Sequence, residues 1–175
     1  MKTVKRTICL LLALVVLLSV SACGFKTVEK SELGLSFVIP EDFVRRELLQ
    51  GVDYSNYERF ADIEYGNGEI FFFADVMPYS ELGLTSSASI TECTETLLDN
   101  MEYSGTNITY DQEKKTATYD TWATEDGTES YYSYITILLG KNSIYIARYA
   151  CPGTDKAMEK YSKRFAEMSA MLVAK

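Results

Sequence analysis

Three consecutive strand-like runs in the second half of the chain constrain its fold more than any other feature. They are Thr116–Trp122, Tyr131–Leu139 and Ser143–Cys151. The turn sequences Glu125-Asp126-Gly127 and Gly140-Lys141-Asn142 separate them, and short connections of this kind join antiparallel neighbours. The second half is therefore predicted to be an antiparallel meander, which must bury at least one face against other elements.

Two pairs of runs in the first half have the pattern of β-hairpins. Phe25–Lys30 and Leu35–Ile39 flank a turn that contains a glycine. Tyr57–Tyr65 and Glu69–Met77 flank Gly66-Asn67-Gly68, which is a strong hairpin signal. The sequence IFFFADV in the last of these runs is apolar on both faces, which is typical of a strand covered on both sides.

Two amphipathic helices complete the predicted elements. Ser89 and Glu92 form a capping box that predicts the start of the first helix, and Gly153 and Thr154 precede the second. Apolar residues recur in both at spacings of three and four, so each helix has one face for packing. These residues are Ile90, Cys93, Leu97 and Met101 in the first helix, and Met158, Tyr161, Phe165, Met168 and Leu172 in the second. This order of elements predicts an α+β fold, an antiparallel sheet with helices packed on it.

The segment GLSFVIPEDF, Gly34–Phe43, resembles the entry segment of the PsbP-like superfamily. In that segment a strand of glycine, aromatic and small residues runs into a proline-acidic turn and a bulky aromatic residue. Leu35 and Phe43 stand where an aromatic residue and a tryptophan are common. The later order of elements is also similar over most of residues 25–175. The resemblance implies an α/β/α sandwich around a twisted antiparallel sheet.

The PsbP-like resemblance transfers no active site. The superfamily includes photosystem II extrinsic subunits, a nuclear-transport GTPase-binding factor and many bacterial lipoproteins. Its better-understood members share the binding of other proteins. The resemblance therefore implies an interaction module rather than a particular reaction.

The start of the chain has the features of an export signal. Lys2, Lys5 and Arg6 precede an uncharged apolar run, Ile8–Val20. That run has the length of a secretory apolar region and is shorter than the roughly 20 residues needed to span a bilayer. It ends in Val20-Ser21-Ala22-Cys23, which resembles the lipobox of bacterial lipoproteins.

The lipobox resemblance implies that lipid is attached to the sulfur of Cys23 and that cleavage removes residues 1–22. Residues 23–175 then form a single domain, tethered through Cys23 to the extracytoplasmic face of the cell membrane. No Ser/Gly/Pro-rich linker follows the cysteine, so the domain is expected to lie close to the membrane. A plain signal peptide and an uncleaved anchor are the alternatives.

Removal of the leader would leave a strongly acidic domain. The chain has 17 basic and 25 acidic residues, of which the leader holds three basic and no acidic ones, so the remainder has a net charge of −11. Nucleic acid is excluded as a partner, because its binding needs clustered lysine and arginine. Anionic headgroups repel an acidic domain, so lipid rather than a basic patch is expected to hold it at the membrane.

Cys93 and Cys151 remain after the leader accounts for Cys9 and the lipid for Cys23. Outside the cell such a pair can form one disulfide, which would stabilise the fold by up to about 4 kcal/mol through the long loop that it closes. The alternative is two separate buried thiols that behave as small apolar side chains.

The chain carries almost none of the residues that catalysis commonly uses. It has no histidine, which excludes Ser-His and Cys-His nucleophiles, histidine bases and histidine metal sites. It also lacks a G-x-S-x-G motif, a serine followed three residues later by lysine, and a P-loop. We therefore expect no metal and no cofactor, and predict that the protein is not an enzyme.

Two groups of carboxylates are the remaining candidates for chemistry. They are Glu92, Glu95 and Asp99 on the first helix, and Asp120, Glu125, Asp126 and Glu129 around one turn. The first group has the pattern of a solvated helix face, and the second lacks the alternating spacing of a calcium loop. A hydrolase with paired carboxylates stays open as a lower alternative, since such pairs meet in space rather than in sequence.

Aromatic residues of the meander are the stronger candidates for a binding surface. Tyr119, Trp122, Tyr132 and Tyr134 lie on neighbouring strands, and Tyr132 and Tyr134 share one face. Exposed tyrosine and tryptophan suit a protein partner or a sugar ring, whereas the alternative is that helices cover them. The sequence thus predicts a lipid-anchored, non-enzymatic interaction module with an unidentified protein partner. Binding of a small apolar or sugar ligand is the alternative.

Overall fold

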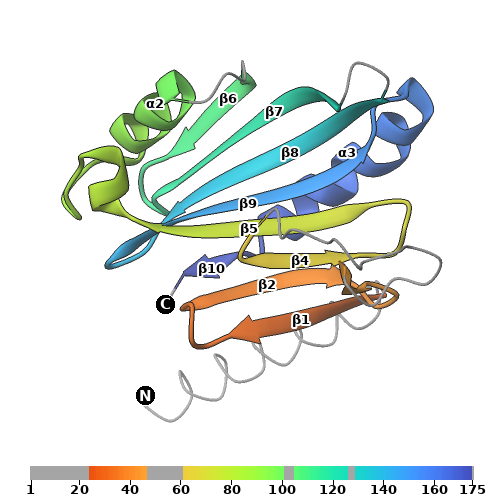
Figure 1. Ribbon diagram of the computed structural model, residues 1–175, viewed down its shortest axis with the longest axis horizontal. Helices are drawn as coiled ribbons and strands as arrows, with labels where there is room; N and C mark the ends of the chain where they lie inside the picture. Colours follow the sequence, from red (N-terminus) through yellow and green to blue (C-terminus); the bar gives the residue numbers. More distant parts are fainter. Residues whose placement is uncertain (1–23, 47–60, 101–104, 126–128, 175) are drawn as a thin grey trace, which may run out of the picture.

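The computed structural model describes residues 24–46, 61–100, 105–125 and 129–174 (Figure 1). The lipobox and the leader lie outside the described residues, as do residues 57–60 of the predicted Tyr57–Tyr65 strand and Met101 of the first helix stripe. The strands are β1 (Phe25–Lys30), β2 (Leu35–Pro40), β3 (Val44–Arg45), β4 (Ile63–Gly66), β5 (Phe71–Pro78), β6 (Thr106–Asp111), β7 (Thr116–Glu125), β8 (Glu129–Leu139), β9 (Ser143–Pro152) and β10 (Val173–Ala174). The helices are α2 (Ile90–Asn100), α3 (Asp155–Ser169) and the short 3-10 helix η2 (Tyr79–Leu82).

The strands form two antiparallel sheets. The larger has seven strands in the order β3-β4-β5-β9-β8-β7-β6, and the smaller has three in the order β1-β2-β10. The predicted meander is therefore confirmed as β7-β8-β9, and the two predicted hairpins as β1-β2 and β4-β5. The two-residue strands β3 and β10 were not predicted.

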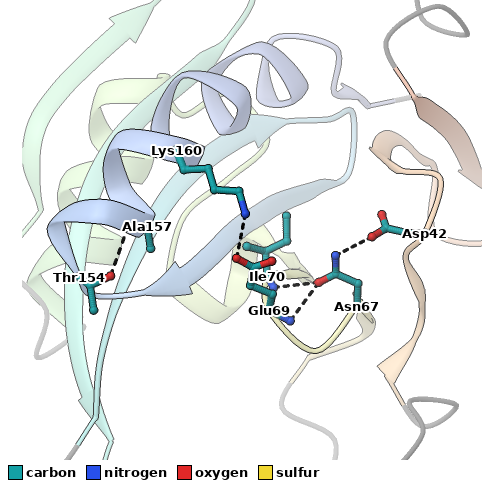
Figure 2. Close-up of polar contacts among 7 residues, drawn as sticks. All are labelled: Asp42, Asn67, Glu69, Ile70, Thr154, Ala157 and Lys160. Carbon is teal, nitrogen blue, oxygen red and sulfur yellow. Dashed lines mark hydrogen bonds and ion pairs between the residues drawn. The ribbon is translucent and has the colours of Figure 1, made fainter.

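Local hydrogen bonds explain where the second hairpin turns and where the helices begin. The Asn67 side-chain oxygen accepts from the backbone nitrogens of Glu69 and Ile70, at 3.0 Å each (Figure 2). Ser89 Oγ accepts from the nitrogen of Glu92 at 3.1 Å, and Thr154 Oγ1 accepts from the nitrogen of Ala157 at 3.3 Å. These side chains satisfy donors that the turn or the first helical turn would leave unpaired.

The two long helices pack on opposite faces of the seven-stranded sheet (Figure 1). We call the two buried clusters the α2 core and the α3 core. The α2 core contains Ile90, Cys93 and Leu97 of the helix with Tyr119, Ile135, Ile137 and Ile144 of the sheet. The α3 core contains Tyr161, Phe165 and Met168 of the helix with Phe72, Tyr132 and Tyr149 of the sheet. The predicted α+β fold, a sheet between helices, is confirmed.

The small sheet shares the α3 side of the large sheet. Phe37 of β2 stacks on Phe72 of β5 with ring centroids 4.5 Å apart. The buried Tyr149 hydroxyl donates to the carbonyl oxygen of Val38 at 2.7 Å. Because α3 contacts β8, β9 and β2, the helix and the small sheet lie side by side over the central strands. The β6-β7 end of this face of the large sheet is not covered by them in the same way and lines a groove.

The strand β5 is covered unequally on its two faces. Phe72 and Ala74 are buried in the α3 core, whereas Phe71 and Phe73 on the opposite face are partly exposed. The guanidinium of Arg148 lies 5.8 Å from the Phe73 ring centroid. The strand is therefore fully buried on one face only.

Cys93 and Cys151 are free and buried. Cys93 belongs to the α2 core and Cys151 to the α3 core, so the sheet separates the two thiols. Burial raises the pKa of Cys151 to about 11 and also raises the pKa of Cys93. Of the two arrangements open for this pair, the structure has two separate buried thiols. No helix in the described part of the chain is long and apolar enough to cross a membrane.

Candidate binding groove

A groove of about 420 Å³ lies between α3 and the strands β6, β7 and β8. Threonine side chains dominate its floor, and we call it the threonine groove. The floor residues are Thr109 and Asp111 of β6, Thr116 and Thr118 of β7, and Tyr134, Thr136 and Leu138 of β8. Ala166, Ser169 and Ala170 of α3 form one wall, which Leu172–Ala174 extend.

Strand register brings the threonines together. Thr118 is the direct partner of Thr109 on one side and of Thr136 on the other. Thr116, two residues earlier on β7, pairs with Asp111 and Leu138. Residues two apart on a strand, and directly paired residues on neighbouring strands, point to the same face. The floor therefore follows from one face of three paired strands.

A hydrogen bond between two buried hydroxyls joins the wall to the floor. Thr136 of β8 and Ser169 of α3 are 2% and 5% exposed, and their hydroxyl groups bond to each other. Both hydroxyls thus have a partner away from water. This contact holds the C-terminal end of α3 against β8, where the wall of the groove meets its floor.

The charged side chains of the groove neutralise each other. Lys114 Nζ lies 3.4 Å from Asp111 Oδ2, and the Lys114 backbone nitrogen donates to Asp111 Oδ1 at 2.9 Å. That backbone hydrogen bond, helped by the Lys114 side chain, lowers the pKa of Asp111. The groove thus contains one ion pair and no net charge from its lining residues.

Trp122 lies beyond the Tyr134 end of the groove, on the same sheet face. It is 45% exposed and pairs with Tyr132 across β7 and β8, with ring centroids 5.7 Å apart in an edge-on arrangement. The Tyr132 hydroxyl donates to Asp120 Oδ1 at 2.7 Å, and Asn107 Nδ2 donates to Asp120 Oδ2 at 2.8 Å. Burial, followed by the Asp120 hydrogen bond, raises the pKa of Tyr132. The Tyr132 ring that contacts Trp122 is therefore itself held in place by Asp120 and Asn107.

The four predicted surface aromatics differ in their exposure and in the sheet face on which they lie. Trp122 is exposed and Tyr134 lines the groove. Tyr132 is only 4% exposed and stacks on Phe165, so it supports the surface rather than forming it. Tyr119 is a correction to the predicted surface. It is 2% exposed and belongs to the α2 core on the opposite face, because it pairs with Ile135 and lies an odd number of residues from Trp122.

The groove threonines were not predicted as site residues, although the sequence contains a signal for them. In Thr116–Trp122 the alternate residues are Thr116, Thr118, Asp120 and Trp122, and the intervening ones are mostly apolar. This period-two pattern indicates one polar face with an aromatic end. The aromatic residues are thus only one end of a surface that the threonines continue.

The carboxylate candidates whose side chains the structure describes are not gathered into a site. Glu92, Glu95 and Asp99 are exposed on α2. Asp120 is hydrogen-bonded to Tyr132 and Asn107. The structure does not describe the side chains of Glu125, Asp126 and Glu129. Within the described ranges, no group of three or more acidic or cysteine side chains could hold a metal ion.

Comparisons with known proteins identify the fold. No protein-family model matches the sequence, and no curated protein is significantly similar to it. A point mutant of the protein Mog1 matches the structure with a TM-score of 0.53 at 12% identity, over 86% of this chain and 95% of that one.

Two further solved structures match with lower scores. A cyanobacterial PsbP from Synechocystis has a TM-score of 0.42 at 12% identity, over 87% of this chain and 93% of that one. LpqN of Mycobacterium tuberculosis, described as involved in cell envelope biogenesis, has 0.41 at 8% identity, over 85% and 89%. What the match to Mog1 shows is a shared α+β fold, an antiparallel sheet with helices packed on it.

Proposed function

We propose that this protein is a non-catalytic binding module, held at the extracytoplasmic face of the cell membrane by lipid on Cys23, and that its ligand binds in the threonine groove beside Trp122. The observation that carries this proposal is the groove itself. An accessible, preformed concavity of about 420 Å³ lies on the face where α3 and the small sheet leave β6 and β7 uncovered. Its volume is within the range of ligand sites in proteins.

The composition of the chain supports binding rather than catalysis. The sequence contains no histidine, and the ionisable side chains that line the groove are a paired aspartate and lysine together with Tyr134. Such a surface offers hydrogen bonds and contact area to a ligand without an activated nucleophile. The sequence predicted a protein partner, and the small-ligand alternative is favoured by the volume of the groove and its position between sheet and helix.

A photo-reactive residue in the groove tests the binding site. We would place benzoylphenylalanine at Thr109, which is exposed and lines the groove, in the full chain in its native membrane. The matched control carries it at Thr27, an exposed threonine of β1. The expected result is one recurrent adduct from position 109 only, identified by mass spectrometry. Equal adducts from both positions, or none from either, would contradict the proposed site.

The lipid anchor needs its own test. Cys23→Ser should release the protein from the membrane fraction and remove the acyl mass from its N-terminal peptide, because a hydroxyl does not form the thioether. Cys9→Ser, which changes the only cysteine of the leader, should leave both readouts unchanged. A Cys23→Ser protein that stays in the membrane fraction with an unchanged N-terminal peptide would exclude lipidation at this position.

A further inference from the structure

We infer that the ligand of the threonine groove is a neutral glycan chain, which lies along β7 over the threonine hydroxyls and stacks one sugar ring on Trp122. This inference rests on the proposed function, since it names the ligand of the same groove. It depends on four properties of the surface: its hydroxyl groups, its charge, its supported aromatic ring and the pairing of its central strands.

Hydroxyl groups are the main polar groups that the floor offers. Thr109, Thr116, Thr118 and Tyr134 line the groove and are not fully buried. A hydroxyl both donates and accepts, so a row of them matches the hydroxyl groups of a sugar whichever way those point. Each threonine also presents a methyl group, and sugar rings carry C–H groups between their hydroxyls. The floor therefore alternates polar and apolar groups over short distances, as a sugar chain does.

The charge of the groove and of the whole protein selects a neutral ligand. The lining charges are Asp111 and Lys114, which form an ion pair with each other. The chain as a whole has a net charge of −8, so its field repels polyanions. A polymer with a negative charge on each unit would therefore be disfavoured, and an uncharged polyhydroxyl chain would be accepted.

Trp122 is a supported platform at the end of the floor. Its partner Tyr132 is held by Asp120, which is held in turn by Asn107, so the ring has little freedom to collapse onto the sheet. From Thr116 to Trp122 the strand extends about 20 Å at its usual rise per residue. The surface can therefore bind several sugar units, the last of them against the indole face.

The central strands of the floor offer a ligand mainly side chains. β8 pairs with β7 and β9, and β7 pairs with β6 from Thr116 to Asp120, with a register shift between Thr106 and Thr109. An extended peptide binds best where main-chain groups are free to add a strand, which on this side of the sheet is the edge strand β6 rather than the floor of β7 and β8. A ligand that lies over β7 therefore depends on side-chain contacts, as a glycan does.

The sole tryptophan of the chain makes a direct measurement possible. Trp122 is the only tryptophan among 175 residues, so tryptophan emission, excited selectively over that of tyrosine, reports on the platform alone. We would titrate the full-length protein in detergent with cellotetraose, maltotetraose, mannotetraose and chitotetraose, and with tetragalacturonate as the charged probe. The expected result is a saturable blue shift with at least one neutral tetrasaccharide and none with tetragalacturonate.

Calorimetric titration of variants locates the binding. Trp122→Ala should weaken the affinity for that tetrasaccharide about tenfold through lost stacking, and Thr118→Val about fivefold through a lost hydrogen bond. Thr27→Val, the same change at an exposed threonine outside the groove, should bind as the parent does. Circular dichroism would verify that each variant is folded.

The outcomes separate this inference from the proposed function. No saturable shift with any neutral tetrasaccharide would overturn the glycan inference, as would equal binding by Thr118→Val and the parent. If the photo-reactive residue at Thr109 then still captures a recurrent protein, the groove is a protein-binding site and the proposed function stands. If both experiments fail, the proposed function falls with the inference.

Discussion

Trp122 is exposed although it lies in a ten-residue strand, and register explains why. β7 alternates between the α2 core and the α3 side, so Ala117 and Tyr119 are buried while Thr118 and Trp122 face the groove side. Whether a residue of this strand is core or surface thus depends on odd or even position. That rule follows from the sequence pattern alone, and it separates Tyr119 from Trp122. What it could not predict is that α3 lies over β8 and β9 and leaves this face of β7 to the groove.

The two buried thiols make a residue-scale prediction. Burial raises the pKa of Cys151 to about 11 and raises the pKa of Cys93, so thiolate is scarce at neutral pH and reagents cannot reach the sulfur. In the native protein without reductant, neither cysteine should react with a maleimide, and both should react after unfolding in urea. Peptide mapping by mass spectrometry measures each site. A pair that resists labelling in urea until reductant is added would show a disulfide instead.

At the scale of elements, the β4-β5 turn holds the start of α3 and the end of β2 together (Figure 2). Glu69 Oε1 accepts from Lys160 Nζ of α3 at 3.0 Å. Asn67 Nδ2 donates to Asp42 Oδ2 at 2.7 Å. The same asparagine closes the turn through its side-chain oxygen. One short turn therefore contacts both layers on the α3 side of the sheet.

Glu69 gives this contact a pH dependence. Interactions with the Tyr161 hydroxyl and with Lys160 lower the pKa of Glu69 below its usual 4.5. A lowered folded-state pKa stabilises the fold above the unfolded-state pKa, and this stability is lost as the pH falls through the folded-state value. Glu69→Gln should therefore lower the free energy of unfolding at pH 7 by at most about 1 kcal/mol, since the pair is exposed. The difference should shrink as the pH falls from 4.5 and vanish below the lowered folded-state pKa.

Urea unfolding of parent and variant between pH 3 and 7 measures this difference. Glu167→Gln is the matched control, because its partner Lys163 lies 4.0 Å away within α3 and links no second element. It should change stability less than Glu69→Gln at every pH. A Glu69→Gln deficit that persists unchanged at the lowest pH would show that packing, not charge, is responsible.

Elements with local signals were predictable, and those without were not. Asn67, Ser89 and Thr154 bond to the backbone two or three residues away, so the turn and both helix starts were readable in sequence. β3 and β10 have two residues each and depend on partners distant in the chain: Val173 pairs with Ser36. No periodic pattern can appear in two residues. The threonine groove likewise depends on the position of α3 over β8, β9 and β2, which no local pattern contains.

At the scale of the whole molecule, one sheet supports two cores. The α2 core and the α3 core lie on its opposite faces, and β8 and β9 contribute side chains to both. Loss of either core should therefore destabilise the other through the shared strands. The predicted α+β layering followed from the helix stripes and the meander, and the structure adds that the small sheet occupies part of the α3 side.

Matched core truncations test this coupling. Phe165→Ala in the α3 core and Leu97→Ala in the α2 core should each cost about 3–5 kcal/mol, because both remove fully packed side chains. Val44→Ala, at an exposed residue of β3, should cost about 0.5 kcal/mol or less. Circular dichroism and Trp122 emission should give coincident urea transitions in all variants. Separate transitions in Leu97→Ala would show that the two sides unfold independently.

The pairing of β2 carries a consequence for the order of events after synthesis. β2 is the middle strand of the small sheet, with β1 on one edge and β10 on the other. Its second neighbour is Val173–Ala174, at the far end of the described chain. During synthesis β1 and β2 therefore emerge early, and β10, which completes the small sheet, emerges after all the other described strands. Under the export that the proposed lipid anchor requires, the small sheet could not close before residues 173–174 had crossed the membrane.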